Sequence, residues 1–106
     1  MTTKQIKQLI AKGEGIEVEF KESYNSLARS VYETICAFLN RRGGHILLGV
    51  KDDKTITGVN EASIPAQLDT LAKDMNNPQI ITPTFYLSSQ VITIGGKKIT
   101  RIDDCK

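Results

Sequence analysis

The sequence contains no tryptophan and few other aromatic residues, with three tyrosines and three phenylalanines among 106 residues. Its core must therefore be built mainly from aliphatic side chains. The two cysteines, Cys36 and Cys105, form no CxxC pair, which argues against a zinc ribbon and a disulfide framework. No apolar run has the length of a signal peptide or a membrane span. We therefore expect a cytoplasmic protein without a membrane partner.

Several catalytic and cofactor motifs are also missing. The chain has no GxxxxGK[ST] phosphate loop, no GxGxxG and no GxSxG. Gly95-Gly96-Lys97-Lys98 is superficially similar to a phosphate loop, but its spacing is that of a hairpin turn. We expect no ATP site. The single histidine, His45, opens an apolar run, and we expect it to be structural rather than catalytic.

The charge balance is mildly basic, with a net charge of +2 at pH 7. This permits contact with nucleic acid, although the pI of about 8.6 is below the value of about 9 that marks a dedicated basic domain. The basic residues fall into small groups, which are either phosphate contacts or ordinary solvated charge. The candidate nucleic-acid contacts are Lys21, Arg41, Arg42, Lys51, Lys54, Lys97, Lys98 and Arg101.

The periodicity of apolar residues predicts one α+β domain covering residues 1–106. We expect a mostly antiparallel sheet, two main packed helices and a short N-terminal helix capped by Thr2 or Thr3 and ended by Gly13. The predicted helices cover 3–12, 25 or 26 to 40, and 63–75. The predicted strands cover 16–21, 45–50, 55–59, 84–94 and 97–102. The abrupt ending after the last strand indicates a fragment of a longer protein.

Acidic residues gather around two of these strands. Glu14, Glu17 and Glu19 lie at the first strand, and Asp52 and Asp53 follow the second. Hydrolysis of a phosphodiester by Mg²⁺ or Mn²⁺ needs two or three converging carboxylates with a nearby basic group. Lys21 could supply that group. The alternative is a polar strand face followed by an ordinary turn rich in aspartate.

Taken together, these motifs resemble the Schlafen-type AlbA domain. The resemblance is carried by Glu14-x4-Glu19-Phe20-Lys21, by Ile35-Cys36-Ala37-Phe38-Leu39-Asn40, by Gly43-Gly44-His45-Ile46-Leu47-Leu48-Gly49-Val50-Lys51-Asp52-Asp53 and by Ile56-Thr57-Gly58-Val59. It implies an α+β fold and binding of DNA or RNA. In bacteria, the resemblance is to the N-terminal part of transcriptional regulators and RecG-related proteins.

The same resemblance implies an enzymatic alternative, because a similar domain in animal Schlafen proteins is a metal-dependent RNA endonuclease. By this likeness Glu14, Glu19 and Asp52 would be the metal ligands, with Lys21 as the accompanying base and Asp53 as an alternative to Asp52. The chain departs from the family pattern at Lys54, where a glycine commonly follows the acidic pair. It departs again at Arg41 and Arg42, where a small or polar residue usually follows the asparagine.

Three functions follow from this reasoning. The leading one is the DNA-binding domain of a bacterial transcriptional regulator, without catalytic activity in isolation. The second is a nuclease that depends on Mg²⁺ or Mn²⁺. The third is a module for homodimerisation or protein interaction.

Overall fold

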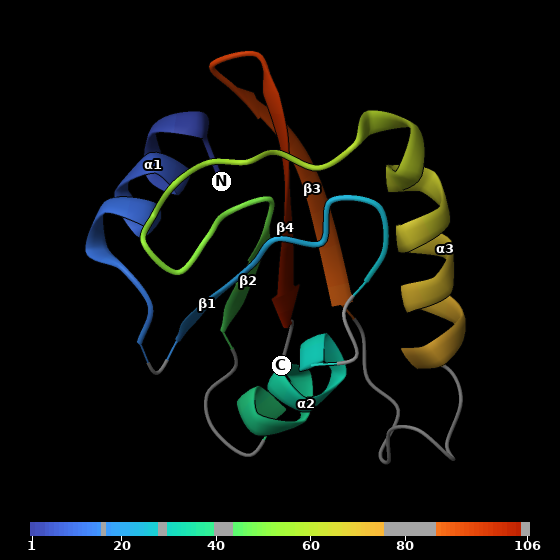
Figure 1. Ribbon diagram of the computed structural model, residues 1–106. Helices are drawn as coiled ribbons and strands as arrows, with labels where there is room; N and C mark the ends of the chain where they lie inside the picture. The colour runs from blue at the N-terminus through green and yellow to red at the C-terminus, as the bar shows by residue number, and fades with distance from the viewer. Residues whose placement is uncertain (16, 28–29, 40–43, 76–86, 105–106) are drawn as a thin grey trace.

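A mixed four-stranded sheet with the strand order β1-β2-β4-β3 forms the centre of the molecule (Figure 1). The computed structural model describes residues 1–15, 17–27, 30–39, 44–75 and 87–104. The strands are β1 (Val18–Lys21), β2 (His45–Leu48), β3 (Leu87–Ile94) and β4 (Lys97–Asp104). β1 pairs with β2 in parallel, whereas β4 is antiparallel to both of its neighbours. The expected α+β class with a mostly antiparallel sheet is confirmed.

Helices cover both faces of this sheet, as Figure 1 shows. Helix α1 (Thr3–Lys12) lies on one face, and α2 (Ser30–Leu39) and α3 (Ile64–Met75) lie on the other, with the 3₁₀ turn η1 (Glu61–Ser63) leading into α3. The core on the α1 face contains Ile6, Ile10, Val18, Phe20, Leu47, Val50, Ile92, Ile94 and Ile99. The opposite core contains Val31, Ile35, Ile46, Leu48, Val59, Ile64, Leu71 and Ile102. In the part of the chain that the structure describes, no helix is both long and apolar enough to cross a membrane.

The boundaries of α1 are those expected from the sequence. The side chain of Thr2 accepts a hydrogen bond from the backbone of Gln5, whose side chain in turn accepts from the backbone of Thr2. This capping box satisfies donors that the first turn cannot pair internally. Gly13 ends the helix with a φ of 88°, which glycine adopts without steric cost.

Three elements differ from the prediction. The second helix begins at Ser30 instead of at residue 25 or 26, because residues 24 and 25 bond to Asn60, the N-cap of η1. Tyr24 O accepts from Asn60 N at 2.8 Å, and Asn25 Oδ1 accepts from Asn60 Nδ2 at 3.0 Å. These long-range bonds hold residues 24 and 25 outside the helix that the local sequence pattern predicts there. The expected strand at 45–50 was also too long, as β2 ends at Leu48, and no strand forms at 55–59.

The segment after β2 is shaped by two glycines. Gly49 and Gly58 have φ values of 98° and 76°, which interrupt the extended backbone. Only two isolated bridges therefore replace the predicted strand at 55–59, joining Val50 to Ile56 and Val59 to Lys98. The predicted contributions of Ile16 and of 84–86 to strands, and of Arg41 and Arg42 to binding, lie outside the described residues.

Candidate functional site

Sequence-predicted residues from two distant segments meet at a polar groove. Because β1 and β2 run in parallel and pair from Val18–His45 to Lys21–Leu48, their carboxyl ends lie side by side. The residues that follow these ends enclose a groove of about 490 Å³. Its lining consists of Phe20, Lys21, Glu22, Val50, Lys51, Asp52 and Asp53. The parallel pairing thus brings Lys21 together with Lys51, Asp52 and Asp53.

A tight turn presents Lys51 and Asp52 at this groove. Lys54 N donates to Lys51 O at 2.9 Å, and Lys51 N donates to Thr55 O at 2.8 Å. Asp53 Oδ1 accepts from Thr55 N at 2.9 Å. Hydrogen bonds from Thr55, with a smaller contribution from the charge of Lys51, lower the pKa of Asp53. Asp53 therefore stabilises the turn, whereas Asp52 and Lys51 are exposed beside it.

Among the predicted metal ligands, Glu14 lies near both Glu19 and Asp52. Burial is the main cause that raises the pKa of Glu14, and the negative charges of Glu19 and Asp52 and a hydrogen bond with Asp52 raise it further. The hydrogen bond from the backbone of Phe20 opposes this shift. Nevertheless, within the described residues no group of three His, Cys, Asp or Glu side chains is arranged to hold a metal ion. Metal binding by Glu14, Glu19 and Asp52 stays a prediction.

Glu14 also has a structural role that the sequence alone did not indicate. Its Oε1 accepts from Phe20 N at 2.9 Å, and Gly15 N donates to Val18 O at 3.0 Å. These bonds satisfy backbone groups on the outer edge of β1, the first strand of the sheet. A sheet edge left open is a template for pairing with other chains. The Glu14–Gly15 segment therefore covers this edge and holds the Glu14 carboxylate near the groove.

The two remaining basic residues near the groove differ in availability. Lys21 Nζ lies 3.6 Å from Glu19 Oε1, so its charge is shared with that carboxylate. Lys54 Nζ donates to Ala11 O at 2.8 Å, at the C-terminal end of α1. A cation is favourable there because the helix terminus carries partial negative charge. Lys54 thus joins α1 to the turn, with a φ of 75° that a glycine would adopt more easily.

The predicted basic group at the end of the chain does not form one surface. Along β4 successive side chains point to opposite faces, which separates Lys98 from Lys97 and Arg101. Lys97 Nζ donates to Ile56 O at 3.0 Å, and Lys98 Nζ donates to Thr93 Oγ1 at 2.8 Å. Arg101 is only 8% exposed. Because side chains alternate along a strand, the sequence alone could have predicted that Lys98 lies on the face opposite to Lys97 and Arg101.

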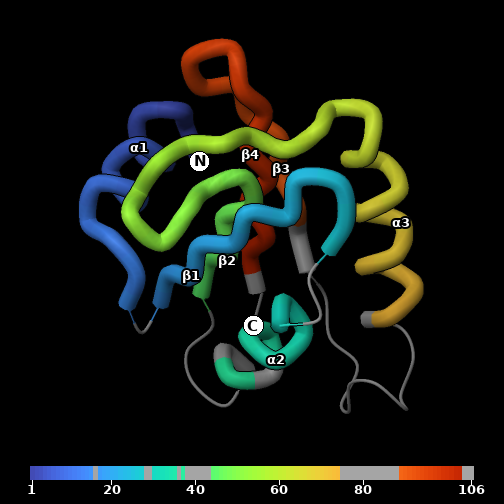
Figure 2. Tube along the Cα trace, in the orientation of Figure 1, coloured from blue at the N-terminus to red at the C-terminus, as the bar shows by residue number. Residues whose placement is uncertain are grey.

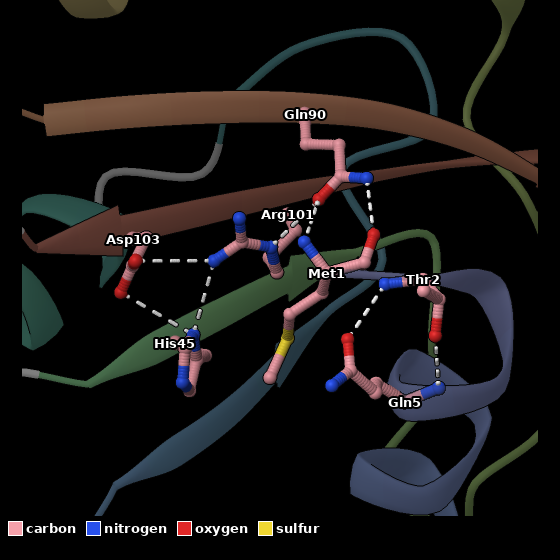
Figure 3. A network of polar contacts seen from close by, with 7 residues as sticks. All are labelled: Met1, Thr2, Gln5, His45, Gln90, Arg101 and Asp103. Atoms are coloured by element: carbon pink, nitrogen blue, oxygen red, sulfur yellow. Dashed lines mark hydrogen bonds and ion pairs between the residues drawn. The ribbon is translucent and has the colours of Figure 1, made fainter.

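Arg101 is the centre of a polar network, which Figure 3 shows. Its Nη1 lies 3.2 Å from Asp103 Oδ2 and 3.3 Å from His45 Nδ1, and its Nε donates to Gln90 Oε1 at 3.2 Å. The side chain of Gln90 also bonds to the amino group and carbonyl of Met1. The network joins β2, β3 and β4 to the residues that precede α1. The sequence did not predict this network, because the strand pairing of the folded sheet is what brings His45, Gln90 and Arg101 together.

These features define a class of protein: an α+β domain in which a mixed sheet, covered by helices on both faces, ends in a polar groove. The sequence profile of the family described as Schlafen, AlbA_2 matches residues 14–103. The chain belongs to the Schlafen AlbA_2 family. The resemblance inferred from the motifs is confirmed.

The chain is also similar to one solved structure and to one protein of known sequence. The solution structure of the N-terminal domain of a RecG-related protein from Nitrosomonas europaea superimposes with a TM-score of 0.67 at 23% identity, covering 96% of this chain and 71% of that one. This likeness shows the fold. An uncharacterized ATP-binding protein of Ureaplasma parvum is 36% identical over 67 residues, which are 60% of this chain. The match spans only 19% of that protein's length.

Proposed function

We propose that this chain binds nucleic acid by contacting phosphate groups along the lysine side of the groove. The observation that best supports this proposal is the position of Lys51, which is exposed at the groove beside Lys21. Within the described residues, the side chain of Lys51 makes no hydrogen bond or ion pair. Phosphate contacts require only such donors at suitable positions. Membership of the AlbA_2 family supports this proposal, because the family is generally associated with nucleic acids.

The acidic residues of the groove limit how a strand can approach. Two lysines and three carboxylates line it, so its formal charge is slightly negative. Phosphate groups are therefore expected to follow Lys21 and Lys51 while avoiding Asp52. A divalent cation held by the carboxylates would reduce the repulsion. We expect millimolar Mg²⁺ to strengthen binding at constant ionic strength.

Substitution of Lys51 tests the proposed surface. Lys51→Ala is expected to weaken binding to a DNA duplex about five- to tenfold near 0.1 M salt, and to reduce the slope of log affinity against log salt by about 0.9, because one phosphate contact is lost. Fluorescence anisotropy over a salt series measures both values. Lys73→Ala is the matched control, since it removes the same charge from a pair with Asp69 on α3.

Some outcomes of these measurements would assign the interface to other residues, and one would contradict the proposal. If Lys51→Ala and Lys73→Ala bind equally well, the groove is not the interface. If binding is instead lost on combining Arg41→Ala with Arg42→Ala, the interface lies with that pair, which is outside the described residues. A duplex that binds neither the original chain nor any variant contradicts the proposal as a whole.

A second candidate function, a nuclease, is favoured by one observation. The charges of Glu19 and Asp52 both raise the pKa of Glu14, so this carboxylate lies near one from β1 and one from the turn after β2, and Lys21 pairs with Glu19. Mg²⁺ or Mn²⁺ bound there would polarise a phosphodiester and activate water. Glu14, Glu19 and Asp52 would hold the cation, and Lys21 would offset charge on the phosphate.

Cleavage assays test the nuclease hypothesis. If the site is active, labelled RNA is cut with Mn²⁺ and remains intact with EDTA. Asp52→Asn is then expected to lower the rate at least about a hundredfold, because a metal ligand is lost. Asp53→Asn is the control for the neighbouring position and should retain most activity, since Asp53 bonds to Thr55 in the turn. Intact RNA with Mn²⁺, or cleavage unchanged by Asp52→Asn, contradicts the hypothesis.

The roles in transcriptional regulation and in homodimerisation stay predictions. The first concerns a whole protein, and the match to this chain covers only 19% of the length of the Ureaplasma parvum relative. The second is decided by sedimentation equilibrium of the chain with and without duplex DNA. A monomer that binds DNA would leave dimerisation unnecessary for that function.

A further inference from the structure

The two edges of the sheet are built differently. On the β1 edge, Gly15 N donates to Val18 O, and Glu14 Oε1 accepts from Phe20 N, so the chain covers its own backbone groups there. The other edge is β3, whose only strand neighbour in the described part of the chain is β4. Figure 2 shows α1 and α3 on opposite sides of the β3–β4 hairpin, where they cover the faces of the sheet instead of extending it. The open edge of the sheet is therefore β3.

Alternate residues of β3 direct their backbone groups away from the sheet. Thr93 lies opposite Lys98 of β4, and Lys98 O accepts from Val59 N at 2.7 Å, so the backbone of Lys98 faces away from β3. Bonded and non-bonded pairs alternate along an antiparallel ladder. The backbone N–H and C=O groups of Ser89, Val91 and Thr93 therefore face outward. Within the described ranges, none of these groups forms a backbone hydrogen bond beyond the ladder.

The side chains along this edge favour pairing with another strand. Ser89, Val91 and Thr93 are exposed, and the apolar Val91 is 42% exposed. Proteins protect open edges from pairing with charged side chains, prolines or a covering segment. None of the eight residues of β3, Leu87–Ile94, is charged or a proline. The sequence of β3 thus contains no residue of the types that oppose pairing.

We propose that β3 pairs in antiparallel orientation with β3 of a second copy of this chain, about a twofold axis at Val91. In this register Val91 lies opposite Val91 of the partner subunit, and Ser89 lies opposite Thr93 of the partner subunit. The first pair covers exposed apolar surface with two β-branched side chains. Thr93 Oγ1 already accepts from Lys98 Nζ at 2.8 Å, which leaves its proton for the serine hydroxyl. This self-complementarity favours a second copy over an unrelated strand.

The pairing closes after two copies. A twofold contact uses the open edge of both chains, and at each outer edge of the resulting eight-stranded sheet the Glu14–Gly15 segment covers β1. The lysine groove lies at β1 and β2, so this inference does not depend on nucleic-acid binding. A contact along one short strand buries less than the roughly 1,600 Å² of a standard interface. We therefore expect a weak dimer, with a dissociation constant of roughly 10–100 μM.

A charge-swap experiment tests both the edge and the register. Val91→Lys and Val91→Glu should each weaken self-association at least about tenfold, because like charges then face each other across the axis. An equimolar mixture of the two variants should associate nearly as tightly as the original chain, since opposite charges then meet. Sedimentation equilibrium between about 5 and 500 μM measures all three. Thr70→Lys adds a charge at an exposed position of α3 and is the control that should leave association unchanged.

Amide hydrogen exchange of the original chain gives a test that needs no variant. The outward amides of Ser89, Val91 and Thr93 should exchange at least about tenfold more slowly at 500 μM than at 5 μM, because pairing with the second copy protects them. The amides of Gln90 and Ile92 point toward β4 and should be protected at both concentrations. Slowing at alternate residues of β3 is a pattern that contact through a helix or a sheet face would not produce.

Three results would overturn the proposal. A chain that stays monomeric at about 500 μM has no such dimer. Association that persists unchanged in Val91→Lys and Val91→Glu, with no slowing of exchange in β3, assigns the contact to another surface. A mixture of the two variants that remains monomeric contradicts the register about Val91. Lys51→Ala should leave association unchanged, so that failure of the groove and failure of the β3 pairing are read separately.

Discussion

Replacing Gly49 with alanine is expected to lower the free energy of unfolding by roughly 2–5 kcal/mol, because backbone strain and overpacking act together. The backbone has a φ of 98° at this residue, a conformation that an alanine side chain disfavours. A Cβ atom at Gly49 would lie 3.0 Å from the carbonyl carbon of Gly58 and 3.2 Å from Lys98 O. Both contacts are to backbone, so neither can be relieved by a side-chain rotation.

Gly15→Ala is the matched control for this experiment. Gly15 is exposed, has no positive φ, and a Cβ there would meet no atom within 4 Å. We expect a change within about 0.5 kcal/mol. Urea unfolding followed by circular dichroism measures both variants. Equal stability of Gly49→Ala and Gly15→Ala would show that the chain separates Gly49 from Gly58 at little cost.

The Gly49 substitution also bears on the groove. Gly49 O accepts from Thr57 N at 2.9 Å and from Gly58 N at 3.0 Å, which fixes the crossing of the two segments just before Lys51. Of the glycines that carried the family resemblance in the sequence, Gly49 is therefore required by close backbone packing, and Gly58 by its φ of 76°. Their direct role is to place the turn, and any contribution to binding follows from that placement.

Replacing Arg101 with methionine is expected to cost roughly 3 kcal/mol of stability, because it removes one partner from a largely buried ion pair. The side chain of Arg101 bonds to Asp103, His45 and Gln90. Methionine retains much of the apolar volume but supplies no donor. The Asp103 side chain is 29% exposed, so water offsets part of the loss. Chemical denaturation measures the difference.

A second substitution separates lost pairing from lost packing. Combining Arg101→Met with Asp103→Asn should recover part of the stability, because the unpaired carboxylate is then neutral. Lys73→Met provides a control at an exposed ion pair, where a change below about 1 kcal/mol is expected. If Arg101→Met is as mild as Lys73→Met, the network contributes little to the fold. Equal loss in the single and double variants would assign the effect to packing.

Local patterns in the sequence predicted the elements whose limits are set locally. The capping residues Thr2 and Gly13 mark both ends of α1, and the Gly95-Gly96 turn joins β3 to β4 as expected. The start of α2 could not be predicted in this way. Asn25 bonds to Asn60, 35 residues later, and a hydrogen bond of that span leaves no periodic signal.

The site could be predicted in part for the same reason. The spacing of Glu14, Glu19 and Asp52 identified acidic residues that the parallel pairing of β1 and β2 brings near one another. The burial of Arg101 depends on neighbours supplied by other elements. Charge alone could not distinguish an arginine of the interior from a lysine of the surface.

The position of β4 between β2 and β3 has a consequence for biosynthesis. The ribosome completes β1, α2 and β2 early, but the strand that joins them to β3 is made last of the four. Until residue 104 has left the exit tunnel, β2 exposes the edge that β4 will occupy. Chaperones that protect unpaired strands would act during this interval. The nascent chain can close its sheet only after β4, which follows the three other strands in the chain, has been synthesised.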